Sequence, residues 1–555
     1  DVLLAYTPTV KQIGVMNNFY EAADGPNWNR QDGWTIGCPC SWYGVTCNER
    51  DYVTGISLPA VGMRGSIPTN VADIWTIESL VLPSNSLTGA IPTQIGMLDL
   101  VELDLNNNQI VAIPTELGLL TKLEALKLAN NKIATPVPTE IAKIPGLTSV
   151  RLENNEIPGP IPDYFGTYTN LDRLELSDNL FSGQVPSSIG RLSLLRKLKL
   201  TNNRLTSLPE GFFTNLVNLE VLDMTNNNLL AIGEEIGDLS KNLSQILLNR
   251  NELTQLPTTL GNLVSLEVLD VSENSLAGYL ITEIGRLENL QTLVLSQNAL
   301  SRTIPTEWTG LVSLRSMDLS RNQLSDRFPF HLRWIDSLEY LDVSTNELFG
   351  VLPGTMQEFI GLRSVYIGNN NFEGPVSDFS QLPVLQVLSA SANALTGPIP
   401  ASFAMASALA SLDLASNQLT GPIVSEIADM PSLQTLNLSG NELSGPFLLG
   451  FTSAPYLRFL DLGHNLLTGS MPTEIGLMTR LNTLRLSGNS FSGTIPTEVG
   501  NMGALTTFAV NENDLNGIVP LEISNLTTMN YLSLDGNSMG GPLPAELGQL
   551  VRVIG

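Results

Sequence analysis

Histidine and cysteine are scarce in this chain, which contains two His and three Cys among its 555 residues. The two histidines, His331 and His464, lie in distant parts of the sequence. Because histidine is the commonest general acid or base, two isolated copies leave little for acid–base catalysis. The sequence also lacks a phosphate-binding loop, a G-x-S-x-G motif and a closely spaced His pair that would bind a metal. We therefore expect no enzymatic activity and no metal or other cofactor.

Long apolar runs and basic residues are lacking as well. No stretch of eighteen consecutive apolar residues occurs, so the sequence contains no predicted transmembrane helix. Only 28 residues are basic against 54 acidic ones, which gives a net charge of −26. This balance argues against a polyanionic partner, and we expect no nucleic acid to bind. It predicts instead an acidic, solvated surface.

What the chain does contain is a repeat of 23 or 24 residues. A clear copy runs over residues 481–500, L-N-T-L-R-L-S-G-N-S-F-S-G-T-I-P-T-E-V-G. Its core is L-x-x-L-x-L-x-x-N-x-[LF], and a degenerate copy at residues 56–58 precedes the regular ones. The core asparagines of the twenty regular copies are Asn85, Asn108, Asn131, Asn155, Asn179, Asn203, Asn227, Asn251, Asn274, Asn298, Asn322, Asn346, Asn370, Asn393, Asn417, Asn441, Asn465, Asn489, Asn513 and Asn537.

The L-x-L segment of each copy has the periodicity of a β-strand, with both leucines on one face. Three residues cannot bury an apolar face alone, whereas many such strands stacked side by side can. The asparagine follows the strand, where its amide can bond main-chain groups within the turn and pass from coil to coil as a ladder. An unsatisfied buried amide costs about 1–3 kcal/mol, so this structural role is favoured over a catalytic one.

The second half of many copies reads L-x-G-x-[IV]-P-x-x-[IL]-G, as in residues 87–92, 395–400 and 491–496. Glycine permits the tight turn, and proline prevents the strand from continuing. These units resemble the plant-specific class of leucine-rich repeat, which is found in receptor-kinase ectodomains and secreted proteins. The resemblance covers about residues 55–550.

The resemblance implies an α/β solenoid, a right-handed superhelix with a parallel β-sheet on its concave side and 3₁₀ or β segments on its convex side. We expect residues 1–54 to form an N-terminal cap and residues 55–555 to form one solenoid of about 21 repeats without a C-terminal cap. The copies around residues 205–209 and 253–257 lack the glycine, so we expect their convex strand to be missing.

The N-terminal segment differs from the repeats. Residues 10–23 have helical spacing, with Ile13, Met16, Phe19 and Tyr20 on one side, and the turn at residues 24–27 ends the helix. A loop containing Trp28, Trp34 and Trp42 follows, and it ends in Cys38-Pro39-Cys40-Ser41-Trp42-Tyr43-Gly44-Val45-Thr46-Cys47. This segment is similar to the cap of leucine-rich repeat proteins, which ends in C-x-W-x-G-[VI]-x-C.

In that family the last cysteine pairs with the one just before the tryptophan. The resemblance therefore implies a Cys40–Cys47 disulfide, with Cys38–Cys47 as the alternative, and the third cysteine is free or bonded elsewhere. A disulfide at the end of a solenoid would hold its first coil and implies an oxidising compartment. A zinc site is a poor alternative, because three cysteines without a nearby histidine do not supply four ligands.

The outward residues of the concave strands are the informative positions for binding. Two zones stand out there, and their residues are our candidate contacts, because Tyr and Arg often carry interface energy. The basic zone comprises Lys127, Arg151, Arg173, Lys197 and Lys199, and the acidic–aromatic zone comprises Asp318, Tyr340, Asp342 and Tyr366. The alternative is that exposed strand positions are simply polar by default.

Three glycosylation sequons agree with an extracellular protein, and they begin at Asn242, Asn437 and Asn525. Asn437 lies between two strand leucines, so a glycan there would cover part of the concave face. The chain begins with Asp1, as expected of a processed form, and it stops at Val553-Ile554-Gly555, where the next strand should begin. We expect either further chain or a partner to cover that open sheet edge.

These features favour a secreted or cell-surface recognition module that binds a protein, peptide or glycan on its concave face. The alternative is a structural unit of an extracellular sheath, wall or appendage, assembled with itself or another protein at its uncapped end. The acidic surface and the absence of a non-repeat island favour the alternative, since steroid and some peptide receptors of the family carry an island. Peptide receptors also often carry an Arg-x-Arg pair on the concave face, which the strand centres here lack.

Overall fold

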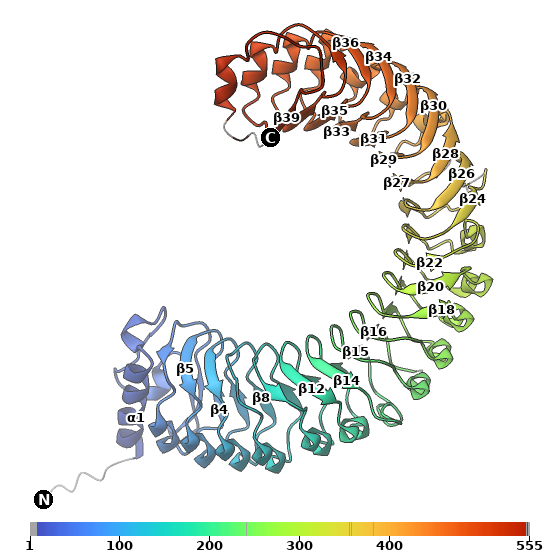
Figure 1. Cartoon of the computed structure of the whole chain (residues 1–555). Helices are drawn as coiled ribbons and strands as arrows, with labels where there is room; N and C mark the ends of the chain where they lie inside the picture. Colours follow the sequence, from blue (N-terminus) through green and yellow to red (C-terminus); the bar gives the residue numbers. More distant parts are fainter. Residues whose placement is uncertain are drawn as a thin grey trace, which may run out of the picture. The chain divides into compact units, whose positions relative to one another are not determined.

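The computed structural model describes residues 8–550 and 552, apart from residues 240, 355, 357 and 381 (Figure 1). Two compact units divide the repeats, and the boundary lies between Leu276 and Ala277. In each unit a long parallel sheet lines the inner side of the curve, and 3₁₀ helices lie along the outer side (Figure 1). The predicted solenoid of stacked coils is therefore confirmed. The division into a cap of residues 1–54 and a single solenoid of residues 55–555 stays a prediction.

The coil at residues 481–500 shows how the pattern folds. Its inward side chains are no more than 2% exposed, and they are Leu481, Leu484, Leu486, Phe491, Ile495 and Val499. Burial of each such side chain contributes about 1.5–3 kcal/mol. Since every coil repeats these positions, the apolar side chains form one continuous core in each unit.

Unit one begins with α1 (Pro8–Ala22) and the short strand β1 (Val45–Cys47), which pairs antiparallel with β2. Its long sheet is parallel from β2 onward. The strands are β2 (Val53–Ser57), β4 (Ser79–Val81), β6 (Glu102–Asp104), β8 (Ala125–Lys127), β9 (Ser149–Arg151), β11 (Arg173–Glu175), β13 (Lys197–Lys199), β15 (Val221–Asp223), β16 (Gln245–Leu247) and β17 (Val268–Asp270).

Two short parallel sheets lie on the outer side of unit one. They are β3 (Arg64–Gly65), β5 (Ser86–Ala90) and β7 (Gln109–Ala112), and β10 (Pro158–Gly159), β12 (Leu180–Gln184) and β14 (Arg204–Ser207). The 3₁₀ helices of this unit are η1 (Gly25–Asn27), η2 (Pro39–Ser41), η3 (Thr69–Asp73), η4 (Thr93–Met97), η5 (Thr115–Leu119), η6 (Thr139–Lys143), η7 (Asp163–Thr167), η8 (Ser187–Arg191), η9 (Glu234–Leu239) and η10 (Thr258–Asn262).

Unit two repeats the arrangement with its own long parallel sheet. The strands are β19 (Thr292–Val294), β21 (Ser316–Asp318), β23 (Tyr340–Asp342), β25 (Ser364–Tyr366), β27 (Val387–Ser389), β29 (Ser411–Asp413), β31 (Thr435–Asn437), β33 (Phe459–Asp461), β35 (Thr483–Arg485), β37 (Thr507–Ala509) and β39 (Tyr531–Ser533).

The outer side of unit two carries two further parallel sheets. They are β18 (Ala277–Tyr279), β20 (Ala299–Arg302) and β22 (Gln323–Leu324), and β24 (Phe349–Val351), β26 (Asn371–Pro375), β28 (Ala394–Gly397), β30 (Gln418–Pro422), β32 (Glu442–Pro446), β34 (Leu466–Ser470), β36 (Ser490–Gly493) and β38 (Asp514–Leu515). The 3₁₀ helices are η11 (Thr282–Arg286), η12 (Thr306–Gly310), η13 (Phe330–Trp334), η14 (Ala401–Met405), η15 (Ser425–Asp429), η16 (Leu449–Ser453), η17 (Thr473–Leu477), η18 (Thr497–Asn501), η19 (Leu521–Asn525) and η20 (Ala545–Gln549).

The core asparagines form the predicted ladder. The side-chain nitrogen of Asn465 donates to the carbonyls of Leu438 in the preceding coil, at 3.0 Å, and of Leu462 in its own coil, at 3.1 Å. Its oxygen accepts from the backbone N–H of Leu443 in the preceding coil, at 3.0 Å. Both ends of the amide are satisfied, so the structure confirms the structural role expected for these residues.

The outer strands differ from the expectation in one copy. Residues 253–257 form no strand, as predicted, but Arg204–Ser207 forms β14 although its copy lacks the glycine. The expectation was wrong there because β14 pairs with β12 of the preceding coil, where Gly183 lies opposite Leu205. An extended backbone next to an existing strand is sufficient for pairing. The coil before residues 253–257 has no outer strand, and so offers no partner.

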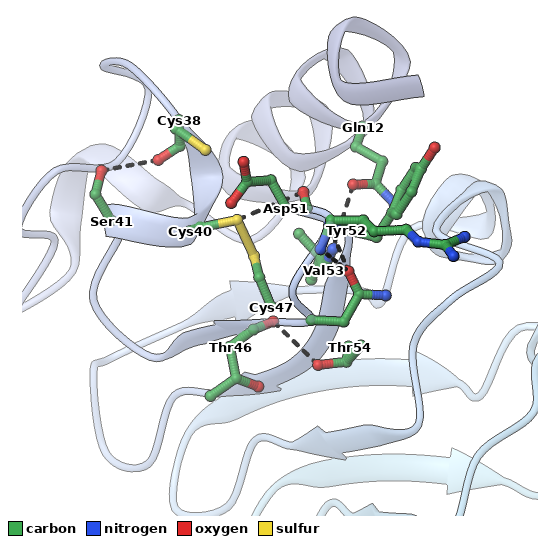
Figure 2. The surroundings of a disulfide bond; sticks show 12 residues. Gln12, Cys38, Cys40, Ser41, Thr46, Cys47, Asp51, Tyr52, Val53 and Thr54 are labelled. Atoms are coloured by element: carbon green, nitrogen blue, oxygen red, sulfur yellow. Dashed lines mark hydrogen bonds between the residues drawn. A yellow bond between two sulfur atoms is a disulfide. The ribbon is translucent and has the colours of Figure 1, made fainter. Parts of the chain in front are cut away.

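The cap is an aromatic cluster held by a disulfide. Trp34 lies at its centre, and its ring packs against the rings of Tyr20, Trp28 and Trp42 with centroids 5.7, 5.0 and 4.9 Å away. The expected helix is present, and the bond joins Cys40 to Cys47, as the first of the two predicted pairings has it (Figure 2). Cys38 is free and exposed.

Candidate recognition surfaces

The inner face of each unit is the surface of its long sheet opposite the buried leucines. In a three-residue strand the middle residue is buried and the two flanking residues face outward, as in β13, where Leu198 lies between Lys197 and Lys199. Neighbouring strands are parallel and in register, so equivalent residues of adjacent coils lie about 4.8 Å apart along the sheet. Residues that are 23 or 24 positions apart in the sequence therefore become neighbours.

The predicted basic residues of unit one lie on four adjacent strands, β8, β9, β11 and β13: Lys127, Arg151, Arg173, Lys197 and Lys199. Register places Lys127 beside Arg151 and Arg173 beside Lys197. Glu175 lies between Arg151 and Lys199 in the same row. The structure thus brings the five residues together, but it interleaves carboxylates among them.

Two of the five basic side chains are neutralised by these carboxylates. The Lys127 ammonium lies 2.6 Å from the carboxylate of Glu102. Arg151 pairs with Glu153, and its guanidinium lies 3.5 Å from Glu175. Burial works to lower the pKa of Arg151, but the hydrogen bond and charge of Glu153 outweigh it and raise the pKa. Neither cation is available for an external anion without losing a partner.

Lys197 and Lys199 are different. Both are half-buried on β13, and neither forms an ion pair within the described part of the chain. Arg173 beside them is exposed and makes only a long contact of 3.8 Å with Asp172. We call Arg173, Lys197 and Lys199 the lysine pair region. Its two lysines are the members of the predicted basic zone that form no ion pair among the described residues, although Glu175 and Asp223 flank Lys199 in the register.

The acidic–aromatic residues of unit two also come together, on β21, β23 and β25. Asp318 and Asp342 are opposite each other in the register, and Tyr366 follows Asp342 on the next strand. The rings of Tyr340 and Tyr366 are 5.5 Å apart between centroids and inclined at 45°. The Tyr340 hydroxyl donates to the Asp342 carboxylate at 3.3 Å. We call these four residues the acidic–tyrosine patch.

No cation balances the two carboxylates of this patch among the residues that the structure describes. The backbone N–H and hydroxyl of Ser344 donate to Asp342 at 2.9 and 2.6 Å. Burial nevertheless raises the pKa of Asp342, and the charge of Asp318 adds to the increase. Burial also raises the pKa of Tyr340, followed by the charges of Asp342 and Asp318. A positive group beside these oxygens would relieve the repulsion.

The sequons lie in three settings. Asn242 and Asn525 are exposed, on a loop and at the end of η19. Asn437 is the last residue of β31, where its side-chain oxygen accepts from the hydroxyl of Ser439 at 2.8 Å. Glycosylation at these positions stays a prediction.

The carboxylates of Glu102 and Glu153, which neutralise Lys127 and Arg151, were not among the residues predicted from the sequence. Glu102 is the first residue of β6, and Glu153 lies two positions after Arg151, the last residue of β9. A signal existed, because writing the repeats in register places Glu102 diagonally beside Lys127. In the described residues no helix is long and apolar enough to cross a membrane, and no three acidic, His or Cys side chains form a metal-binding group.

Solved structures resemble this chain along most of its length. The plant peptide hormone receptor RGFR1, in complex with RGF2, matches with a TM-score of 0.79 and 29% identity over 93% of this chain and 94% of that one. The Arabidopsis receptor kinase HAESA, in complex with the peptide hormone IDA and the co-receptor SERK1, matches with a TM-score of 0.75 and 29% identity over 98% and 97%.

Family models match the repeats directly. The leucine-rich repeat region model matches residues 243–456, and two leucine-rich repeat models match residues 193–253 and residues 170–192, 456–478 and 480–502. The chain is a leucine-rich repeat protein. A 74-residue segment of this leucine-rich repeat protein is 42% identical to the receptor-like kinase RGI4 of Arabidopsis thaliana. That segment is 13% of the chain and 7% of the kinase, so the match spans a small part of the relative.

Proposed function

We propose that this leucine-rich repeat protein is an extracellular recognition module that binds a protein or peptide on the inner faces of its repeats. The likeness to RGFR1 and HAESA, whose structures contain peptide hormones, supports a peptide or protein ligand. The Cys40–Cys47 disulfide supports an oxidising compartment outside the cytosol, and the three sequons agree with it.

The observation that carries the proposal is the pair of lysines of the lysine pair region. A protein with a net charge of −26 holds Lys197 and Lys199 on one strand, and neither forms an ion pair among the described residues, although Glu175 and Asp223 lie beside Lys199 in the register. The neighbouring Lys127 and Arg151 are paired. A half-buried ammonium group that forms no ion pair loses solvation without a direct partner. A ligand carboxylate seated between them would supply the missing partner, so we assign an acidic ligand segment to the lysine pair region.

The acidic–tyrosine patch suits a positively charged group of a ligand. The Asp318 and Asp342 carboxylates attract a cation, and the rings of Tyr340 and Tyr366 offer faces over which a cation is also favoured. An Arg or Lys side chain would meet both kinds of group at once. We therefore assign a basic ligand side chain to this patch. Each assignment concerns one unit alone.

A selection experiment tests the proposal. A random peptide library displayed on phage is selected on the purified chain, and we expect enrichment of peptides with an acidic segment. The affinity of one enriched peptide is then measured by calorimetry for the parent and for the Lys197→Ser/Lys199→Ser double variant. We expect at least a tenfold loss in the variant and a loss of affinity with rising salt, because the contact is between charges.

A second double variant, Lys143→Ser/Lys241→Ser, serves as the matched control. It removes the same charge from two exposed lysines of the same unit, one of them at the end of η6. We expect its affinity to remain within twofold of the parent. Equal losses in the two double variants would reduce the effect to net charge and contradict a site at the lysine pair region. A selection that yields no inner-face binder would contradict the proposed function.

A further inference from the structure

A polar hollow of about 350 Å³ lies on the inner face of unit two, over the adjacent strands β33, β35, β37 and β39. Polar and small residues line it, and those that the argument uses are Asp461, Arg485, Ser487, Ala509, Asn511 and Tyr531. No motif of the sequence pointed to it, and it is separate from the acidic–tyrosine patch. Its volume falls at the lower end of the range of about 300–1,000 Å³ for small-molecule sites.

The hollow exists because small side chains replace large ones in register. Ala509 lies beside Arg485 at the last position of its strand, which other coils fill with longer side chains such as Leu247 and Asp413. The His464 imidazole, in the lining of the hollow, lies over the backbone of Gly488, where an added Cβ would meet its Nδ1 at 2.3 Å. Gly488 also has a φ of +63°, a conformation that glycine adopts without strain. Because Gly488 has no side chain, it leaves the space that the His464 imidazole occupies.

The charges of the hollow cancel. The buried Asp461 carboxylate accepts from the backbone N–H of Gly463 through one oxygen, at 3.0 Å, and from Arg485 through the other, at 3.5 Å. An added anion would be attracted by Arg485 but repelled by Asp461. An added cation would be attracted by Asp461 but repelled by Arg485. A neutral ligand avoids both penalties. This distinguishes the hollow from the lysine pair region and from the acidic–tyrosine patch.

The polar groups of the hollow combine donors and acceptors. The Ser487 hydroxyl donates to the side-chain oxygen of Asn511 at 2.5 Å, which leaves the amide nitrogen of Asn511 as a donor. Arg485 supplies further N–H donors, and Asp461 supplies an acceptor. The ring of Tyr531 is 44% exposed at the edge and offers an apolar face with a hydroxyl beyond it.

Hydroxyl groups arranged around a ring with an apolar face are the chemistry that such a lining recognises. We propose that the polar hollow binds a sugar ring of a neutral saccharide. The hydroxyls both donate to Asp461 and accept from Arg485 and Asn511, while the flat face of the sugar packs against Tyr531. A peptide is a poorer fit, because the lining is confined to a few coils and offers a single aromatic surface. The proposal does not depend on the peptide ligand proposed above.

Two sources of such a sugar are close at hand. The sequon at residues 437–439 borders the hollow, since Ser439 lines it and Asn437 lies opposite Asp461 in the register. The sugar is therefore either the chain's own glycan on Asn437 or a saccharide from outside. Both present the same neutral, hydroxylated chemistry, and the experiment separates them.

The test fills the hollow without changing its charge. In Ala509→Leu the added side chain takes up part of the hollow. Leu247 holds the equivalent position, the last residue of β16, so the fold accepts leucine there. The control is Ser389→Leu, at the last position of β27 in the same unit and outside the hollow. Both changes are made in full-length chains that carry Asn437→Gln, so that no glycan occupies the site. Thermal unfolding checks that each variant is folded.

Binding is measured by saturation-transfer NMR and calorimetry with neutral disaccharides of glucose, mannose and N-acetylglucosamine, and with a glucuronate disaccharide. We expect a neutral disaccharide to bind the Asn437→Gln parent, to lose at least tenfold in affinity in Ala509→Leu, and to change by less than twofold in Ser389→Leu. Binding unchanged in Ala509→Leu, absence of binding by every neutral disaccharide, or preference for the glucuronate would each overturn the proposal.

The parent with Asn437 intact and glycosylated identifies the source. Weaker binding of the free disaccharide than in Asn437→Gln means that the attached glycan competes for the hollow, which supports the proposal with the chain's own sugar as ligand. Equal binding in the two chains supports it with an external saccharide. Neither result bears on peptide binding by the lysine pair region, so the two proposals fail independently.

Discussion

The side-chain oxygen of Asn203 accepts a hydrogen bond from the backbone N–H of Phe181 in the preceding coil, at 3.0 Å. The nitrogen of the same amide donates to the carbonyls of Leu176 and Leu200, both at 3.1 Å, so one side chain joins two coils. Asn203 is 8% exposed, and the groups it bonds are buried with it. Water cannot replace the amide if it is removed.

We expect Asn203→Ala to lower the free energy of unfolding by about 1–3 kcal/mol, because buried backbone groups lose their partner. Urea unfolding followed by circular dichroism measures the change. Asn215→Ala is the control, since Asn215 is exposed in the same unit. A loss in Asn203→Ala no larger than in the control would show that the ladder contributes little to stability.

The second prediction concerns Gly500 in η18. A Cβ added there would lie 2.4 Å from the backbone oxygen of Glu522 in the next coil, so the coils approach too closely for any side chain. We expect Gly500→Ala to lower the free energy of unfolding by about 1–3 kcal/mol. Gly503→Ala is the matched control, because nothing lies within 4 Å of its Cβ. Its effect should be below about 1 kcal/mol, and the same urea titration compares the two.

The cysteines give a third prediction. Cys40→Ser removes the Cys40–Cys47 bond and should lower the free energy of unfolding of the cap by about 2 kcal/mol, whereas Cys38→Ser should leave it nearly unchanged. Thiol titration of the native parent should find one reactive group, the exposed Cys38. Destabilisation by Cys38→Ser instead of Cys40→Ser would indicate that the Cys38–Cys47 pairing forms in solution.

The acidic–tyrosine patch gives a pH-dependent prediction. Because burial raises the pKa of Asp342 in the folded chain, its contribution to stability is fully present below the unfolded pKa of about 3.9 and is lost as pH rises through the folded pKa. Asp342→Asn removes this loss, so the variant should be more stable than the parent at neutral pH and should lose that advantage near pH 3.

Urea unfolding of both chains at pH 7 and pH 3 measures this difference. Asp336→Asn is the control, because Asp336 is exposed in the same unit. An advantage of Asp342→Asn that is as large at pH 3 as at pH 7 would mean that ionisation of Asp342 is not its cause.

Much of the fold was predictable from local pattern. The strands, the buried leucines, the asparagine ladder and the helix of the cap follow from spacing alone, because each depends on residues within one coil and its copy in the next. The outer strand β14 was missed because pairing there depends on the neighbouring β12, and the missing glycine was a poor guide. The Cys40–Cys47 bond followed from resemblance to the family and not from the spacing of three cysteines.

The candidate sites were predictable only as groupings. Repeat register was sufficient to place Lys197 beside Arg173 and Tyr366 beside Asp342. Register did not show that Glu102 would form an ion pair with Lys127, since that depends on how far each side chain reaches. The polar hollow was beyond prediction as well, because an empty volume is set by the joint conformation of several side chains.

The sequence by itself determined that this chain stacks into coils with one apolar seam and an asparagine spine, because an apolar strand too short to fold alone can be buried only against its own copies. Only the tertiary structure decided which charged side chains form ion pairs with each other and which remain for a ligand. The physical reason is that side-chain length and rotamer decide whether neighbouring groups of opposite charge meet. Lys127 pairs with Glu102, whereas Lys199 forms no ion pair with Glu175 or Asp223, which lie beside it in the register.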